Sequence, residues 1–286
     1  MIKFENTEVM GWEHTIRGMR NPLNSWDKSD TGYIKKCSSI CKYYDEENEI
    51  CRSYDWSGQT INADNCYEFV IGPNDIELMK RLRNAGTDHR KFMRMITVYV
   101  DITAPLYWWK EFDTYKVGTV ANSCSTMHKI AAKEFTLGDF SYEHLVNIYT
   151  LQQVIEDLNF WRDAYLINDG DERVEYIRSR FDPEKVDPFM SKKDCWWQMF
   201  QLLPSSYNQK RTVMMNYEVL ANIYKSRRNH KLDEWAEHME STCPVNENTI
   251  CRNPKEFLLC EDCSVGKGFC DWIKTLPYSE LITGDL

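Results

Sequence analysis

The stretch Gln209–Trp235 constrains the fold of this chain most strongly, because it combines an apolar periodicity with a dense set of basic residues. When the stretch is read at about 100° per residue, Val213, Tyr217 and Leu220 fall in one apolar stripe. Other apolar side chains surround much of the remaining circumference, which is typical of a central helix in a sizeable domain. The pattern therefore predicts a helix over 208–235 at the centre of the fold.

The same stretch holds six basic residues and three acidic ones, in a chain whose formal net charge is -9. This local excess of positive charge predicts an anion site. Arg227 lies nearly in line with Asn216 along the edge of the apolar stripe. A guanidinium held beside a core suits bidentate binding of a phosphate, a carboxylate or a pyrimidine edge. A structural arginine paired with a neighbouring carboxylate fits the spacing equally well.

Length and composition indicate a globular protein. With 286 residues, 42% of them hydrophobic, the chain can bury a large core as one embellished domain or as two modest domains. No run reaches the roughly 18 apolar residues that a membrane helix needs, and the N-terminal residues lack the apolar core of a secretory signal. We therefore expect a cytoplasmic protein that does not bind membranes. The net negative charge argues against general binding of nucleic acid.

Hydrophobic patterns along the rest of the chain predict an α+β class with a helical majority. Alternation from Met95 to Thr103 is typical of a half-buried strand, and residues 2–5 are consistent with a short one. Asn74-Asp75 followed by Glu77 forms a capping pattern for a helix that Gly86 ends. Helices are predicted over 12–19, 73–85, 105–112, 127–133, 141–166, 171–180 and 194–202, with a polar loop over 118–126.

The run Trp196–Trp235 resembles the flavin-dependent thymidylate synthases. The family's Leu-Pro, its two asparagines and its arginine recur at matching separations as Leu203-Pro204, Asn216, Asn222 and Arg227. The resemblance implies that Asn216 and Asn222 contact flavin. It also implies that Arg227 binds the uracil ring of dUMP and favours its ionised, nucleophilic form. The arginine that the family places three residues before its Leu-Pro leucine is Phe200 here.

The run His89–His128 is similar to the same family in framework but not in signature. The family's Arg-His-Arg triplet is replaced by Thr114-Tyr115-Lys116, so that only Lys116 keeps a positive charge. Loop hydroxyls are more often turn formers than ligands. By resemblance, the flavin site would include His89, Lys91, Thr114, Tyr115, Lys116 and Thr119, and the nucleotide site Lys116, Asn122, Cys124, Ser125 and Thr126.

The resemblance implies an enzyme that reductively methylates dUMP to dTMP with FAD, NADPH and methylenetetrahydrofolate. It further implies a helix-rich α+β fold with a small antiparallel sheet, one domain over 1–286, and a homotetramer with active sites between subunits. In such an enzyme the flavin supplies the hydride, and Arg227 would stabilise negative charge on the pyrimidine as the catalytic residue. A nucleotide-binding protein of the same fold with lost or changed catalysis is the alternative.

Cys124 could also act as a nucleophile toward C6 of a pyrimidine, although a cysteine among small residues is equally a simple filler. The aromatic pair Trp108-Trp109 could stack on a ring system, but aromatic residues at helical spacing are more often core.

Nine of the eleven cysteines lie in two inserts, at about 31–70 and 237–270. Only Cys260 and Cys263 have the C-x-x-C spacing that lets two thiolates reach one zinc. A structural zinc held by Cys251, Cys260, Cys263 and Cys270 is one interpretation, and reduced thiols or a disulfide are the others. The inserts also raise a third class of function, a zinc-stabilised interaction protein.

Overall fold

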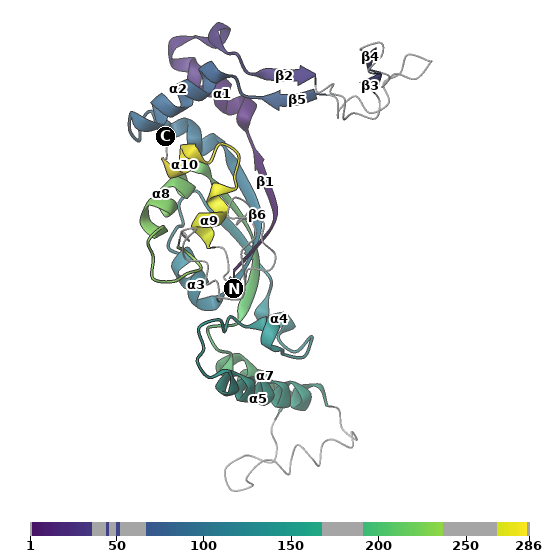
Figure 1. The fold of residues 1–286 in the computed structure, drawn as a ribbon. Helices are drawn as coiled ribbons and strands as arrows, with labels where there is room; N and C mark the ends of the chain where they lie inside the picture. Colours follow the sequence, from purple (N-terminus) through teal and green to yellow (C-terminus); the bar gives the residue numbers. More distant parts are fainter. Residues whose placement is uncertain are drawn as a thin grey trace, which may run out of the picture. The chain divides into compact units, whose positions relative to one another are not determined.

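The computed structural model describes residues 2–35, 44–45, 50–51, 67–167, 191–236 and 268–284 (Figure 1). Contacts within the chain divide it into two compact units. The first holds Met1–Val9 with Thr97–Leu286, and the second holds Met10–Ile96. No helix in the described ranges is both long and apolar enough to cross a membrane.

A four-stranded sheet in the order β1-β6-β8-β7 forms the centre of the first unit. Strand β8 pairs antiparallel with β6 on one side and with β7 on the other. The strand predicted from Met95 to Thr103 is confirmed as β6, since Val98, Val100 and Ile102 are buried on one face. The strands are β1 (Lys3–Met10), β6 (Thr97–Pro105), β7 (Val120–Ser123) and β8 (Asn208–Asn216).

The prediction of one helix over 208–235 is wrong at both ends, because β8 occupies its start and the helix stops at Arg227. Helix α8 (Tyr217–Arg227) follows the strand directly. Val213 and Met215 are fully buried at the period of two that a strand requires, and β8 bonds to strands on both sides. Asn216 then caps α8, because its side-chain oxygen accepts a first-turn backbone N–H at 3.0 Å. Pairing with β6 and β7 therefore stabilises a strand here, and this pairing cannot be read from the sequence of the segment alone.

Helices α3, α8 and α9 lie on one side of this sheet (Figure 1). Aromatic rings fill much of the space beneath them. Trp108 stacks on Trp235 with ring centroids 4.4 Å apart, and Phe269 lies 5.7 Å from Trp108. Trp108 and Trp109 are 0% and 1% exposed, so the pair belongs to the core. Helix α3 spans Leu106–Phe112, α9 spans Phe269–Lys274 and α10 spans Glu280–Thr283.

The residues that precede and follow 237–267 are hydrogen-bonded to each other. Phe269 donates its N–H to the carbonyl oxygen of Glu234 at 2.8 Å, and Cys270 donates to that of Trp235 at 3.2 Å. A Cβ on Gly268 would lie 2.2 Å from the carbonyl oxygen of Ala236. Residues 236 and 268 are therefore close neighbours in the first unit.

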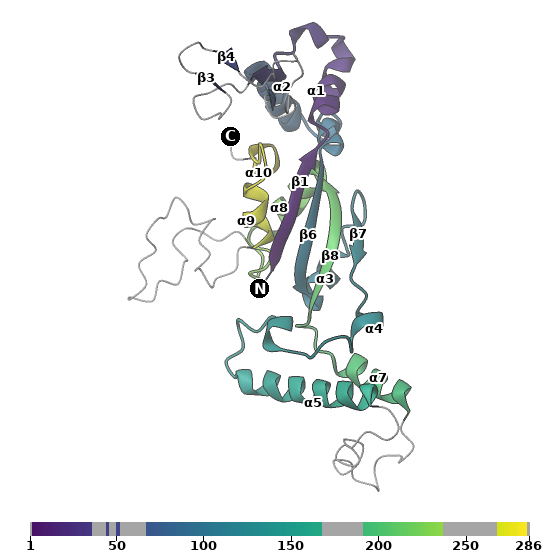
Figure 2. The ribbon, with the colours of Figure 1, turned by 90° about the vertical axis from the view of Figure 1, so that its right-hand side faces the viewer.

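Helices α5 (Ile148–Leu166) and α7 (Lys192–Leu202) pack against each other (Figure 2). The helix predicted over 194–202 is confirmed by α7. The helix predicted over 141–166 begins only at Ile148, because the Asn147 side chain caps α5 there. The helix predicted over 171–180 lies outside the described residues.

The loop predicted over 118–126 contains strand β7. All four side chains of β7 are exposed, so no apolar alternation marks this strand in the sequence. The helix predicted over 127–133 is shorter than expected, since only α4 (Thr126–Lys129) forms there.

The second unit confirms the helices predicted over 12–19 and 73–85, as α1 (Trp12–Arg20) and α2 (Pro73–Asn84). The cap of α2 differs from the predicted one, because the Asp30 carboxylate accepts the first-turn N–H groups of Asn74 and Asp75. The other elements are η1 (Asn21–Leu23), η2 (Trp26–Lys28), η4 (Arg90–Met95), the antiparallel pair β2 (Gly32–Lys35) and β5 (Tyr67–Val70), and the short pair β3 (Tyr44–Asp45) and β4 (Ile50–Cys51).

A buried ion pair joins α1 to α2. Arg20 Nε lies 2.7 Å from Asp75 Oδ1, and the two side chains are 5% and 0% exposed. The second carboxylate oxygen of Asp75 accepts hydrogen bonds from the hydroxyls of Ser29 at 2.6 Å and Thr31 at 2.7 Å. Both oxygens of the buried carboxylate are therefore occupied, which offsets the cost of removing its charge from water.

Candidate functional site

Arg227, the last residue of α8, is held by side chains from α3 and the turn after it. Its Nε donates to Tyr115 Oη at 2.8 Å, and its Nη1 donates to Glu111 Oε2 at 2.7 Å. The guanidinium also lies over the Trp235 ring, 5.0 Å from its centroid. Within the described residues Nη2 has no hydrogen-bond partner, and the side chain is 19% exposed. Among the described residues, therefore, one edge of the guanidinium faces no hydrogen-bond partner.

Glu111 accepts a hydrogen bond from Arg227, and the ring of His230 lies beside both groups. Nε2 of His230 lies 2.7 Å from Arg227 Nη1 and 3.5 Å from Glu111 Oε2. The other ring nitrogen, Nδ1, accepts the backbone N–H of Leu232 at 3.2 Å. Arg227 is thus paired with a neighbouring carboxylate, as the second interpretation of the sequence expected.

The positive charge of Gln209–Trp235 is largely compensated by carboxylates from other parts of the chain. Three of its six basic residues have acidic partners outside the stretch, so charge counted in a sequence window overstates the local positive potential. The pairs are Lys210 with Glu5 (2.9 Å), Arg211 with Asp113 (2.7 Å) and Arg227 with Glu111 (2.7 Å).

The turn before β7 packs against the start of α8. Gly118 has a φ of 76°, and a Cβ there would lie 3.0 Å from Asn216 Nδ2. The Thr119 hydroxyl donates to the carbonyl oxygen of Tyr115, which fixes this turn. Tyr115, Thr119 and Asn216 come from two separate runs of the sequence, and the fold brings them to the helix that carries Arg227.

Replacing Gly118 by alanine should lower the free energy of unfolding by about 1–2 kcal/mol, because the left-handed backbone disfavours a Cβ and Asn216 must move. Chemical denaturation measures this loss. The matched control is Gly138→Ala, where the added Cβ meets only Thr136 Oγ1 at 3.7 Å and φ is not positive. We expect a change of less than about 0.5 kcal/mol there. Equal losses in the two variants would contradict the packing described for Gly118.

The candidates for the nucleotide site beyond Lys116 lie along β7 and at the start of α4. Asn122 stands opposite Thr212 in the sheet, and both Asn122 and Cys124 are exposed. Ser125 caps α4, and its Oγ lies 2.6 Å from Nδ1 of His128. The Thr126 hydroxyl accepts from Gln209 Nε2 at 3.1 Å. These contacts are with the sheet and the turn itself.

The candidates for the flavin site divide between the two units. His89 and Lys91 are exposed around the start of η4 in the second unit. Thr114 and Lys116 are exposed in the turn after α3, and Asn222 is exposed on α8, all in the first unit.

Three of the four predicted zinc ligands, Cys251, Cys260 and Cys263, lie outside the described residues. The fourth, Cys270, is fully buried in α9. Among the residues that the structure does describe, no three His, Cys, Asp or Glu side chains are placed to hold one metal ion. Burial, with a smaller contribution from Asp194, raises the pKa of the buried Cys195 thiol. The structural zinc stays a prediction.

Comparison with solved structures finds similarity to thymidylate synthase X (ThyX) from Helicobacter pylori in complex with FAD and dUMP. One such structure has a TM-score of 0.47 and 12% identity, over 100% of this chain and 98% of the other. A second has a TM-score of 0.41 and 14% identity, over 80% and 85% of the two chains. No protein-family model and no curated protein matches this chain. With TM-scores below 0.5, neither structure assigns a ligand or a reaction here.

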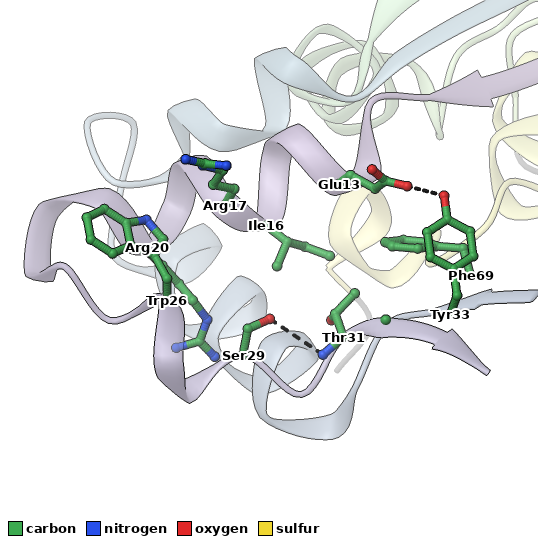
Figure 3. Close-up of a pocket in the computed structure, with 10 residues that line it drawn as sticks. Glu13, Ile16, Arg17, Arg20, Trp26, Ser29, Thr31, Tyr33 and Phe69 are labelled. Atoms are coloured by element: carbon green, nitrogen blue, oxygen red, sulfur yellow. Dashed lines mark hydrogen bonds between the residues drawn. The ribbon is translucent and has the colours of Figure 1, made fainter.

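A separate cavity of about 520 Å³ lies in the second unit (Figure 3). Glu13 and Ile16 of α1 line it together with Tyr33 and Phe69 of the β2–β5 pair. Glu13 accepts a hydrogen bond from the Tyr33 hydroxyl, and the Tyr33 and Phe69 rings lie 5.4 Å apart. None of its lining residues belongs to the runs that carry the family resemblance.

The sequence prediction missed Glu111 and His230. Each lies one helical turn from a residue that was selected: Glu111 precedes Tyr115 by four positions, and His230 follows Arg227 by three. Such spacings bring side chains together in helices and tight turns, and could have identified both residues.

Proposed function

We propose that this chain catalyses the flavin-dependent reductive methylation of a pyrimidine deoxynucleotide, for which the family resemblance names dUMP as substrate and dTMP as product. The observation that supports the proposal is the cluster at α8. Asn216 caps this helix beside Gly118, and Arg227 ends it in contact with Tyr115. Residues from the two matched runs, about a hundred positions apart, therefore meet in one region of the first unit.

The chemistry of this cluster suits a pyrimidine. The available Nη2 of Arg227 can donate to a ring oxygen or nitrogen and stabilise negative charge there, and the Trp235 ring and Glu111 fix the guanidinium in advance. Preorganised donors of this kind contribute several kcal/mol to a transition state.

The exposed groups around the cluster fit phosphate and a flavin edge. The Lys116 ammonium, the Thr114 hydroxyl and the Asn222 amide are exposed on this unit. A bound FAD would supply the hydride, with NADPH as its reductant and methylenetetrahydrofolate as the one-carbon donor. We propose His89 and Lys91 as further flavin contacts and Asn122, Cys124, Ser125 and Thr126 as nucleotide contacts, in a cytoplasmic homo-oligomer with sites between subunits.

A visible absorption spectrum of the freshly purified protein tests the proposal. We expect flavin bands at about one FAD per chain, bleaching by NADPH under anaerobic conditions, and reoxidation that depends on the nucleotide and methylenetetrahydrofolate. A colourless protein that takes up no added FAD would contradict the proposal.

One observation favours a second candidate, a nucleotide-binding protein of this fold with lost or changed catalysis. Arg227 shares its charge with Glu111, and Thr114 and Tyr115 provide no cation where the family has Arg and His. This candidate predicts nucleotide binding without any bleaching by NADPH. The interaction protein stabilised by zinc rests on cysteines outside the described residues.

A further inference from the structure

The cavity in the second unit (Figure 3) has no part in the proposed function. Its volume of about 520 Å³ lies within the range of pockets that bind small molecules. None of its lining residues is among those proposed to contact flavin or nucleotide. All of them belong to Met10–Ile96, so the walls of the cavity come from one compact unit.

Three aromatic side chains form part of the wall, and two of them are largely exposed. Trp26 is 49% exposed and Tyr33 is 61% exposed. The Trp26 indole is held in place, because its Nε1 donates to Asn21 Oδ1 at 2.8 Å. Tyr33 stands opposite Phe69 in the β2–β5 pair, with ring centroids 5.4 Å apart. Ordered aromatic rings that stay exposed in a concave wall suit a flat, apolar group of a ligand, which would cover them.

The cavity also holds guanidinium donors that lack a partner. Arg17 makes no hydrogen bond or ion pair with any described residue. Arg20 is 5% exposed, and its Nε and Nη1 donate to Asp75 and to the carbonyl oxygen of Ser25. Nη2 of Arg20 has no hydrogen-bond partner among the described residues, yet this atom keeps contact with solvent. Because Arg20 lines the cavity, its Nη2 is a largely buried donor that remains for a ligand there.

The carboxylates of this region are already engaged. Both oxygens of Asp75 accept hydrogen bonds from side chains of the second unit. Glu13 accepts a hydrogen bond from the Tyr33 hydroxyl, and Figure 3 shows these two residues at the opposite end of the cavity from Arg20. The donors without a partner are therefore guanidinium groups away from Glu13, and guanidinium groups bind carboxylate and phosphate.

We propose that this cavity binds a small anion that carries a planar aromatic ring, the chemistry shared by nucleoside monophosphates and aryl carboxylates. Arg17 and Nη2 of Arg20 bind the anionic group, and the ring lies against the exposed aromatic side chains of the wall. The planar fork of a guanidinium matches both carboxylate and phosphate, and aromatic side chains stack on bases and other flat rings. The inference goes beyond the proposed function, because it uses none of the residues assigned to flavin or nucleotide.

Titration calorimetry of the full-length protein with AMP and, separately, with indole-3-acetate tests the inference. We expect at least one of the two probes to bind with a dissociation constant below about 1 mM, and the tighter one shows whether phosphate or carboxylate is preferred. Arg17→Ala removes a charge-assisted contact and should weaken binding at least about tenfold. Trp26→Ala should weaken binding by about tenfold, whereas Trp26→Phe keeps an aromatic ring and should lose less.

Arg81→Ala is the matched control, because Arg81 is an exposed arginine of the same unit that does not line the cavity. Its affinity for the probe should equal that of the unaltered protein. Binding of neither probe at millimolar concentration, or equal affinity in Arg17→Ala and the unaltered protein, would overturn the inference and leave the proposed function standing. A protein that binds a probe through Arg17 but takes up no FAD would contradict the proposed function and leave this inference in place.

Discussion

Replacing Arg227 by alanine should reduce the nucleotide-dependent oxidation of the reduced flavin by at least about a hundredfold, the usual effect of removing one preorganised donor from a reacting group. The variant loses the Arg227 guanidinium, whose Nη2 has no hydrogen-bond partner among the described residues. It also leaves the Glu111 carboxylate without its cation. Anaerobic stopped-flow absorbance of the NADPH-reduced protein measures the reoxidation. Nucleotide affinity, measured by calorimetry, should fall in parallel.

The adjacent residue provides the control for this variant. Arg228 is exposed and carries the same charge, so Arg228→Ala should keep the reoxidation rate within about twofold. Arg227→Lys retains the charge but not the planar fork, and should recover only part of the activity. If Arg227→Ala stays folded and reoxidises at the unaltered rate, the role proposed for this guanidinium is wrong.

Removing the Asp75 side chain should have the largest effect on stability. Asp75→Ala leaves the Arg20 guanidinium, only 5% exposed, with an uncompensated charge, which typically costs about 3–5 kcal/mol. Hydrogen exchange of the amides in α1 and α2 reports this loss within the second unit. Asp27→Ala changes an exposed carboxylate of the same unit and should alter exchange little. Unchanged protection in Asp75→Ala would show that the ion pair does not stabilise this unit.

The same carboxylate should make the second unit sensitive to acid. Burial alone would raise the pKa of Asp75, but hydrogen bonds from Ser29, Thr31 and Arg20 outweigh burial and hold this pKa below its ordinary value. The stability that Asp75 contributes is therefore present above the unfolded pKa of about 3.9 and is lost as the pH falls through the lower, folded pKa. Protection of α1 and α2 should decline over that range in the unaltered protein, and decline less in Asp75→Ala.

The sequence predicted those elements whose apolar period is unambiguous. The alternation around Val98 and Val100 identified β6, and the stop signal at Gly86 agrees with the end of α2. Strand β8 was misread as helix because the spacing of Val213 and Tyr217 fits one helical stripe. In the structure Val213 lies in the strand and Tyr217 begins the helix that follows. Strand β7 was missed because all its side chains are exposed, and only its pairing with β8 defines it.

The sequence predicted the arginine of the candidate site but not the carboxylate that pairs with it. Arg227 was selected by its place beside an apolar helix, and it does lie next to a core that includes Trp235. Its partner Glu111 is 116 positions away in the sequence, so only the packing of α3 near the end of α8 makes the pair visible. Net charge in a window contains no information about such distant partners.

Backbone hydrogen bonds join Glu234 to Phe269 and Trp235 to Cys270, so the residues that flank 237–267 are held next to each other. Since the two ends already touch, lengthening or exchanging what lies between them alters the closure entropy by only about 0.6 kcal/mol for each doubling in length. The junction that brings Trp235 and Phe269 into the aromatic layer is thus made by residues 234–236 and 268–270 themselves.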